Sequence, residues 1–128
     1  MEKGVAMPMV DVLIPQGALK PEAEARLLSE LTDILITLEG FDATNQRASD
    51  VTVIYVHRPA DVYVAGARAT SPRYRITPTV PERQYTDAIR KAVVKQMTEA
   101  VARGEGCTVE EAGPRVLVFP TADGVAAA

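Results

Sequence analysis

Hydrophobic and polar positions in the first third of the chain predict a strand followed by an amphipathic helix. A mostly apolar run over residues 9–14 is interrupted only by Asp11, which is typical of a strand covered on both faces. After a turn at residues 15–17, Pro21 suits a first helical position. Large apolar side chains then recur at helical spacing up to a stop signal at Gly40, and they are Leu27, Leu28, Leu31, Ile34, Leu35 and Leu38.

The same order of patterns recurs further along the chain. A polar loop over residues 42–50 leads to a β-branched run over 51–56, which predicts a second strand. Residues 73–80 predict a third strand, and Thr86 can cap a second helix. The final strand is expected over residues 115–119. The apolar face of the second helix is formed by Ile89, Val93, Met97, Ala100 and Val101.

A shift of 66 residues superimposes the first strand, the helix and their junctions on the corresponding segments of the second half without a gap. This shift aligns Pro15 with Pro81, Thr32 with Thr98, Glu39 with Glu105, and Gly40 with Gly106. The sequence therefore predicts an internal repeat, with one β-α-β unit in residues 8–66 and another in residues 73–123 of a single domain that spans residues 1–128.

Two tandem β-α-β units predict an α/β (α+β) domain with a four-stranded sheet and both helices on one face. The opposite sheet face then has no helix to cover it, although its strands are apolar. Another subunit is the simplest cover for that face. Pro78 lies inside the third strand, and its missing N–H favours an edge or bulged strand.

Composition and charge narrow the function classes. The chain has 128 residues, of which 47% are hydrophobic and 24% charged, and this profile is that of one globular domain. A net charge of -3 does not favour nucleic acid or an anionic membrane as a partner. No apolar run approaches the roughly 20 residues of a membrane span, and the first residues do not resemble a signal peptide. We therefore expect a soluble, cytoplasmic protein.

The metal-binding and redox-active residue types are scarce. Cys107 is the only cysteine, so it cannot form an internal disulfide, and it has no histidine close to it in the sequence. His57 is the only histidine. We therefore expect no metal site.

From Pro8 onward, the sequence resembles the tautomerase superfamily, which includes 4-oxalocrotonate tautomerase and malonate semialdehyde decarboxylase. Residues 8–17 are similar to the family's opening strand and turn, and residues 50–66 to its second strand and the glycine-containing turn after it. The tripeptide His57-Arg58-Pro59 matches one in the decarboxylase branch. The resemblance implies a fused double β-α-β subunit, a homotrimer, and chemistry that needs no cofactor.

The family's catalytic group is an amino-terminal proline, and Pro8 stands at its position. A free N-terminal proline is a secondary amine, whose protonated form is disfavoured in a dry pocket near positive charge. It can then act as a general base or, once protonated, as a general acid. The resemblance implies tautomerisation, or a related hydration, dehalogenation or decarboxylation, of a small 2-oxo, enol or unsaturated carboxylic acid.

Further site residues follow from the resemblance. Arg83 and Arg115 stand at positions of substrate-binding arginines, which hold carboxylates in a bidentate manner. Tyr63 stands at the position of an aromatic that lines the pocket. Asp50 matches the water-activating aspartate of the decarboxylase branch. His57 is a further candidate, but the sequence favours a structural role for it at a strand end over a catalytic one.

The sequence also departs from the family pattern. Thr52 stands in the first unit where Arg115 stands in the second, and Pro8 follows seven residues, Met1–Met7. A proline inside a chain has an amide nitrogen with no basic lone pair, so it cannot be the catalytic base. Translation from Met7 followed by methionine removal, or an equivalent processing event, would expose the Pro8 amine.

Two other interpretations remain open at this stage. The chain could be a non-catalytic trimeric pseudoenzyme or small-ligand-binding protein, with Pro8 blocked by the N-terminal extension. It could also be a ferredoxin-like regulatory domain, because a β-α-β-β-α-β order fits that fold as well. Such regulatory domains usually pair as dimers.

Overall fold

The computed structural model describes residues 9–123, and these residues form one sheet covered by two long helices. In chain order the elements are β1 (Met9–Leu13), α1 (Pro21–Leu38), α2 (Gln46–Asp50), β2 (Val53–His57), β3 (Tyr63–Val64), β4 (Ala67–Arg68), β5 (Tyr74–Pro81), the 3-10 helix η1 (Glu82–Gln84), α3 (Asp87–Glu105), α4 (Val109–Ala112), the 3-10 helix η2 (Gly113–Arg115), β6 (Val116–Val118) and β7 (Thr121–Asp123).

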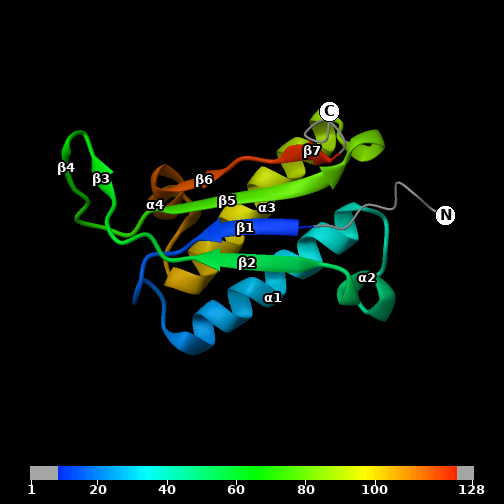
Figure 1. Ribbon diagram of the computed structural model, residues 1–128, viewed down its shortest axis with the longest axis horizontal. Helices are drawn as coiled ribbons and strands as arrows, with labels where there is room; N and C mark the ends of the chain where they lie inside the picture. The colour runs from blue at the N-terminus through cyan, green and yellow to red at the C-terminus, as the bar shows by residue number, and fades with distance from the viewer. Residues whose placement is uncertain (1–8, 124–128) are drawn as a thin grey trace.

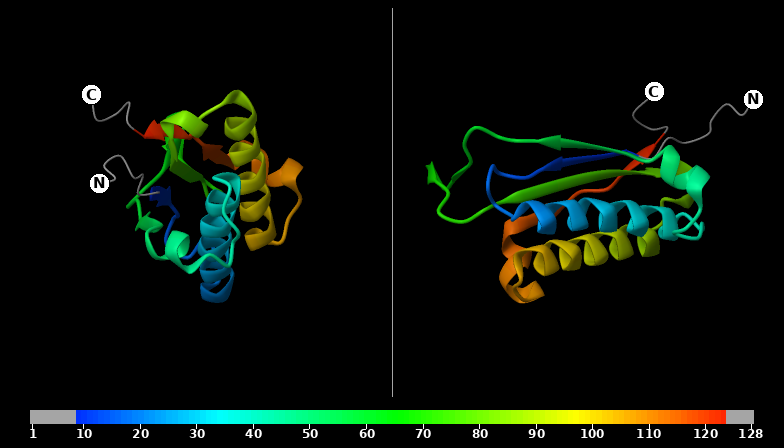
Figure 2. Two further views of the ribbon diagram at one scale, coloured as in Figure 1. Left: turned by 90° about the vertical axis from the view of Figure 1, so that its right-hand side faces the viewer. Right: turned by 90° about the horizontal axis from the view of Figure 1, so that it is seen from below.

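The sheet has the strand order β2-β1-β5-β6, and β7 extends the position of β6 by pairing with β5. The pairs β1–β2 and β5–β6 are parallel, whereas β1 and β5, which join the two units, are antiparallel. Both α1 and α3 lie on one face of the sheet (Figures 1 and 2). The expected fold is confirmed, with the fourth strand split into β6 and β7 and with a small β3–β4 hairpin in addition.

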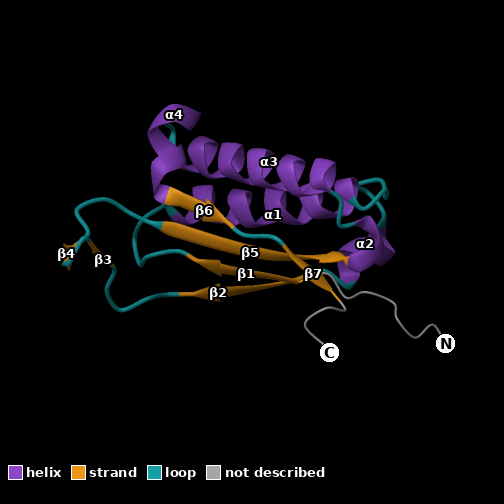
Figure 3. Ribbon diagram, turned by 90° about the horizontal axis from the view of Figure 1, so that it is seen from above, coloured by secondary structure: helices purple, strands orange, loops and turns teal. Residues whose placement is uncertain are grey.

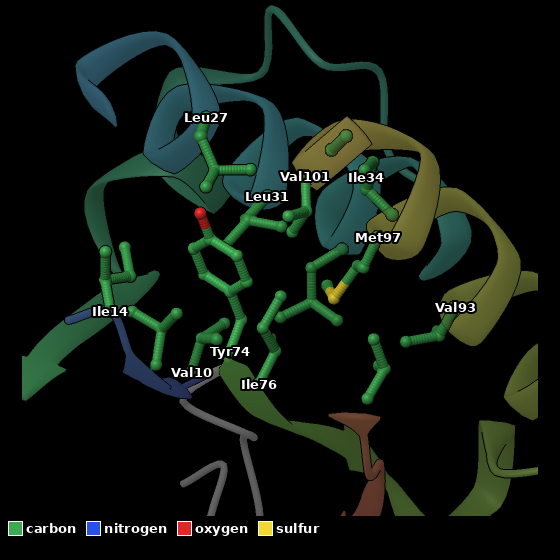
Figure 4. Close-up of a cluster of buried hydrophobic side chains, with 14 of the residues drawn as sticks. Val10, Ile14, Leu27, Leu31, Ile34, Tyr74, Ile76, Val93, Met97 and Val101 are labelled. Atoms are coloured by element: carbon green, nitrogen blue, oxygen red, sulfur yellow. The ribbon is translucent and has the colours of Figure 1, made fainter. Parts of the chain in front are cut away.

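The core lies between the sheet and the two helices (Figure 4). β1 and β5 bury alternate side chains toward the helices, among them Val10, Val12 and Ile76, each with 0% exposure. The buried positions of α1 are Leu27, Leu31, Ile34, Leu35 and Ile36. Those of α3 are Val93, Met97, Ala100, Val101 and Ala102. Each α3 position follows its α1 counterpart by 66 residues, so the two helices present the same face to the sheet.

Two local expectations were wrong. Part of the predicted polar loop forms α2, whose first turn is stabilised by Asn45, since its side chain accepts a hydrogen bond from the Ala48 N–H. Pro78 lies in a central strand and not at an edge. The Ile76 carbonyl accepts a hydrogen bond from the Phe119 N–H, so the backbone groups of Ile76 face the β6 side. Pro78, two residues later, faces the same side, where its missing N–H would point to the gap between β6 and β7. The strand therefore tolerates the proline.

Candidate functional site at the start of β1

The predicted site residues divide between the two ends of the sheet. Pro8 lies outside the described residues, but its neighbour Met9 opens β1 and pairs with Val53 at the start of β2. β5 ends on the same side, which we call the β1-start end. Arg83 lies there in η1, directly after β5, and Asp50 lies there at the end of α2 (Figure 1). Both side chains are exposed.

The other candidates lie at the opposite end of the sheet. Tyr63 is on the β3–β4 hairpin, which projects from that end, and the ring is 59% exposed beneath the guanidinium of Arg68. Arg115 precedes β6, and His57 closes β2. The five residues of β1 span about 17 Å at about 3.4 Å per residue. Within one chain, the structure therefore does not bring Tyr63, His57 or Arg115 to the β1-start end.

Arg115 is held by a carboxylate of its own chain. Its two terminal nitrogens donate to Glu105 at 2.6 and 2.8 Å, and the Tyr74 hydroxyl donates to the same carboxylate at 2.6 Å. Only 17% of the Arg115 side chain and 11% of the Glu105 side chain are exposed. The Arg115 guanidinium holds the pKa of Glu105 below its ordinary value, and burial raises the pKa of Tyr74. A substrate carboxylate would have to displace Glu105 from this arrangement.

Glu39 is the counterpart of Glu105 in the first unit, and its surroundings are different. It caps the C-terminal end of α1 at the β1-start end, with 8% exposure. The Gln84 side chain donates to its backbone carbonyl at 3.0 Å, but its Oε2 is buried without a hydrogen-bond partner among the described residues. Burial raises the pKa of Glu39 to about 7. It is a buried acid that can exchange a proton near neutral pH.

Sequence reasoning did not single out Glu39 as a site residue. The signal was nevertheless present, because the 66-residue shift aligns Glu39 with Glu105, while residues 49–53, which lead into β2, include no arginine or lysine to match Arg115. Thr52 donates its hydroxyl proton to the Ala48 carbonyl at 2.8 Å, so it supplies no charge to Glu39. The first unit keeps the acid of the second unit but lacks its cation.

Within residues 9–123, α1 and α3 lie on one face of the sheet and no helix covers the opposite face (Figure 3). That opposite face carries exposed apolar side chains. Tyr55 is 52% exposed, Leu117 55% and Phe119 60%. His57 and Asp11 also lie on this face, where the His57 Nε2 is 2.8 Å from the Asp11 Oδ1. We call this surface the outer sheet face. Burying it against another protein surface would remove apolar area from water, which is favourable.

Residues 9–123 contain neither a cluster of metal-binding side chains nor a membrane-spanning helix. No group of three or more histidine, cysteine, aspartate and glutamate side chains in this range is arranged to hold a metal ion. Nor does any helix of the range combine the length and apolar character needed to cross a membrane.

Comparison with known proteins gives matches in structure and not in sequence. No family model matches the chain, and neither does any curated protein. The crystal structure of native Ps01740 matches with a TM-score of 0.71 at 16% identity, covering 94% of this chain and 97% of that one.

Two further solved structures match over much of their length. Pt0534 inactivated by 2-oxo-3-pentynoate matches with a TM-score of 0.68 at 17% identity, covering 89% and 84% of the two chains. A fused 4-OT, described as a wild-type symmetric trimer, matches with a TM-score of 0.67 at 21% identity over the same shares. Paired β-α-β units arranged as in this chain therefore occur in other solved proteins.

Proposed function

We propose that this chain, which has the fold of the tautomerase superfamily, is an enzyme subunit that transfers a proton on a small 2-oxo, enol or unsaturated carboxylic acid. The observation that carries the proposal is the position of β1, which begins at Met9, directly after the proline of the family resemblance. The structural match to Pt0534, a protein inactivated by a small 2-oxo acid, supports the substrate class.

Pro8 is the acid–base group in this proposal. It serves that role only as the first residue of the chain, because only then is its nitrogen an amine. A positioned acid or base contributes about 10²–10⁴-fold to a proton transfer. Arg83 binds the substrate carboxylate, since its guanidinium is exposed at the same end and has no ion-pair partner within residues 9–123.

The other candidate residues have secondary places in the proposal. Asp50 lies at the β1-start end, where its carboxylate accepts a hydrogen bond from Gln46 at 2.7 Å. Tyr63 and His57 lie at the opposite end, so they can contribute only to the site of a neighbouring subunit. We assign Arg115 to the stability of the second unit, because Glu105 already occupies its guanidinium.

We expect Arg83→Ala to weaken the binding of phenylpyruvate by about 1.5–3 kcal/mol, the range for hydrogen bonds to charged groups. Titration calorimetry on the chain that begins at Pro8 measures this change. Arg26→Ala is the matched control, since Arg26 is an exposed arginine near the other end of α1. Equal affinities in the wild type and in Arg83→Ala would contradict the role of Arg83.

The subunits assemble as a homotrimer through the outer sheet face in this proposal. That face has three large apolar side chains that are more than half exposed, Tyr55, Leu117 and Phe119. The fused 4-OT that matches this fold is described as a trimer. Burial of such a surface is the main favourable contribution to most subunit association.

We expect light scattering at micromolar concentration to give three times the 13.8 kDa mass of one chain. Leu117→Asp should lower this mass, because it places a charge on the buried interface. Val109→Asp is the control, since Val109 is 41% exposed but lies on α4, away from the outer sheet face. A monomer would contradict the proposal, and a dimer would favour the ferredoxin-like regulatory interpretation.

A second candidate function is the binding of a small acid without catalysis. The seven residues before Pro8 favour it, because they convert the proline nitrogen to an amide. In this case Arg83 still binds a carboxylate, but no proton is transferred. Mass spectrometry of the N-terminus of the protein from its natural source separates the two functions.

A further inference from the structure

A pocket of about 350 Å³ lies at the end of the sheet where β1 ends and β5 begins, and we call it the β5-start pocket (Figure 1). Its polar lining consists of Tyr74 and the arginines Arg73, Arg75 and Arg115. Its apolar lining consists of Leu13, Pro59, Val62, Pro114, Val116 and Leu117. No aspartate or glutamate of residues 9–123 lines it. The pocket therefore combines an apolar lining with positive charge.

Two of its three arginines have no acidic partner. Glu105 neutralises Arg115 through hydrogen bonds at 2.6 and 2.8 Å. Arg73 donates only to the Pro114 carbonyl, at 3.2 Å, and neither Arg73 nor Arg75 forms an ion pair within the described part of the chain. The Nε of Arg73 is buried there without a hydrogen-bond partner. Burial of part of an unpaired guanidinium is costly, so a bound anion would stabilise this arrangement.

The geometry of β5 brings the two unpaired arginines to the same pocket. Arg73 directly precedes β5, and Arg75 is its second residue. Tyr74, between them, is buried and donates its hydroxyl proton to a carboxylate of α3. Two residues along a strand span about 7 Å, so both long side chains can reach one carboxylate. Arg75 also pairs with Leu13 on β1 and with Leu117 on β6, which places it between two apolar residues of the lining.

The acids that line the adjoining pockets do not neutralise these arginines. Asp11 lines one adjoining pocket together with Arg75, but its Oδ1 lies 2.8 Å from the His57 Nε2 and it forms no ion pair with Arg75. Asp61 lines another adjoining pocket and pairs with Arg68. The charge in the β5-start pocket is therefore available to a ligand.

We propose that the β5-start pocket binds a small organic acid with an apolar body, at a site separate from the proposed active site. Arg73 and Arg75 hold the carboxylate, because the donors of a guanidinium match its two oxygens. The apolar lining takes the hydrocarbon part of the acid, whose removal from water is favourable. A volume of about 350 Å³ is at the lower end of the range of about 300–1,000 Å³ for ligand pockets, which suits an acid of the size of 3-phenylpropionate. The site needs neither Pro8 nor Arg83, so the inference does not rest on the proposed function.

Titration calorimetry with 3-phenylpropionate, on the chain that begins at Met1 and in its native assembly, tests the proposal. We expect Arg73→Gln and Arg75→Gln each to weaken binding by about 10-fold or more, because each removes a charged donor. Arg26→Gln is the matched control, since it removes an exposed arginine of α1. The absence of binding to the wild type, or an affinity unchanged in both variants, would overturn the proposal.

A second measurement needs no substitution, so it remains decisive if Arg73→Gln does not fold. The side-chain Nε–H signals of Arg73 and Arg75 are followed by nuclear magnetic resonance as 3-phenylpropionate is added. We expect both signals to shift, and 3-phenylpropanol, which has the same body without the charge, should shift them much less. Signals that stay unchanged at saturating acid would overturn the proposal.

Smaller anions test the ligand class. Acetate should bind more weakly than 3-phenylpropionate by about 10-fold or more, because it lacks the apolar body. Phosphate that binds as tightly as 3-phenylpropionate would show a site for inorganic anions, and it would overturn the assigned ligand class.

Arg83→Ala separates this site from the proposed active site. We expect it to leave the affinity for 3-phenylpropionate unchanged, since Arg83 lies at the β1-start end. Loss of binding in Arg83→Ala but not in Arg73→Gln would place the acid at the β1-start end and overturn the proposal. An inactive Pro8 chain whose Arg73 and Arg75 still bind the acid would instead count against the enzyme function alone.

Discussion

A chain that begins at Pro8 is expected to convert phenylenolpyruvate to its keto form at least 100-fold faster than a chain that begins at Met1. The reason is that the Met1 chain has an amide nitrogen at residue 8, which can neither take up nor release a proton. General acid–base catalysis typically contributes about 10²–10⁴-fold, and the Met1 chain would lose that contribution. Spectrophotometric rates on the two purified chains, at equal concentration, measure the difference.

The pH dependence of that rate distinguishes the two roles of the amine. If the protonated amine is the acid, the rate should fall as the pH rises through the pKa of the amine. If the neutral amine is the base, the rate should instead rise through the same pKa. Equal rates for the Met1 and Pro8 chains would show that Pro8 is not the catalyst. An absence of activity in both chains would favour the non-catalytic binding function. Pro8→Ala in the short chain is a milder control, because its primary amine retains some basicity.

The two long helices could be predicted because their signals are local. The apolar stripe of α1 recurs at helical spacing, and the same buried face reappears 66 residues later in α3. The N-terminal cap of α3 could also be predicted, and in the structure the Thr86 hydroxyl accepts a hydrogen bond from the Ile89 N–H at 3.1 Å. Such features depend on residues within a few turns of each other. A sequence pattern is therefore sufficient to locate them.

The arrangement of the site could not be predicted in the same way. β1 and β5 are antiparallel, and this relation between the units places Arg83, which follows β5, at the end of the sheet where β1 begins, whereas Arg115, which precedes β6, lies at the other end. Nothing in the local pattern of either unit determines that orientation. The alignment of Glu39 with Glu105 is visible in the sequence, but the partners of each carboxyl group depend on packing between distant segments. Arg115 consequently resembled a substrate-binding residue, whereas the structure pairs it with Glu105.

Substitutions at the two glutamate sites, Arg115→Met beside Glu105 and Glu39→Gln, are expected to change the free energy of unfolding in opposite directions. Arg115→Met leaves Glu105 buried without its cation, and breaking a buried ion pair destabilises a protein by about 3–5 kcal/mol. We expect about 3 kcal/mol at pH 8, the lower end of that range, because 17% of Arg115 and 11% of Glu105 remain exposed. Glu39→Gln should instead increase the free energy of unfolding at pH 8, because it replaces an ionised carboxylate whose Oε2 is buried without a hydrogen-bond partner among residues 9–123.

The pH dependence of these two effects follows from the pKa shifts. The pKa of Glu105 is lowered in the folded protein, so its stabilisation is present above the ordinary value of 4.5 and is lost as the pH falls. The pKa of Glu39 is raised to about 7, so its ionisation destabilises the fold progressively as the pH rises from 4.5 to about 7. The loss of unfolding free energy caused by Arg115→Met should therefore be smaller at pH 5 than at pH 8. The increase in unfolding free energy caused by Glu39→Gln should largely vanish at pH 5. Urea unfolding of the Met1 chain at both pH values, at one protein concentration, measures both effects. A loss of stability in Glu39→Gln at pH 8 would mean that Glu39 has a cationic partner in the folded protein, and that the first unit neutralises its buried acid as the second unit does.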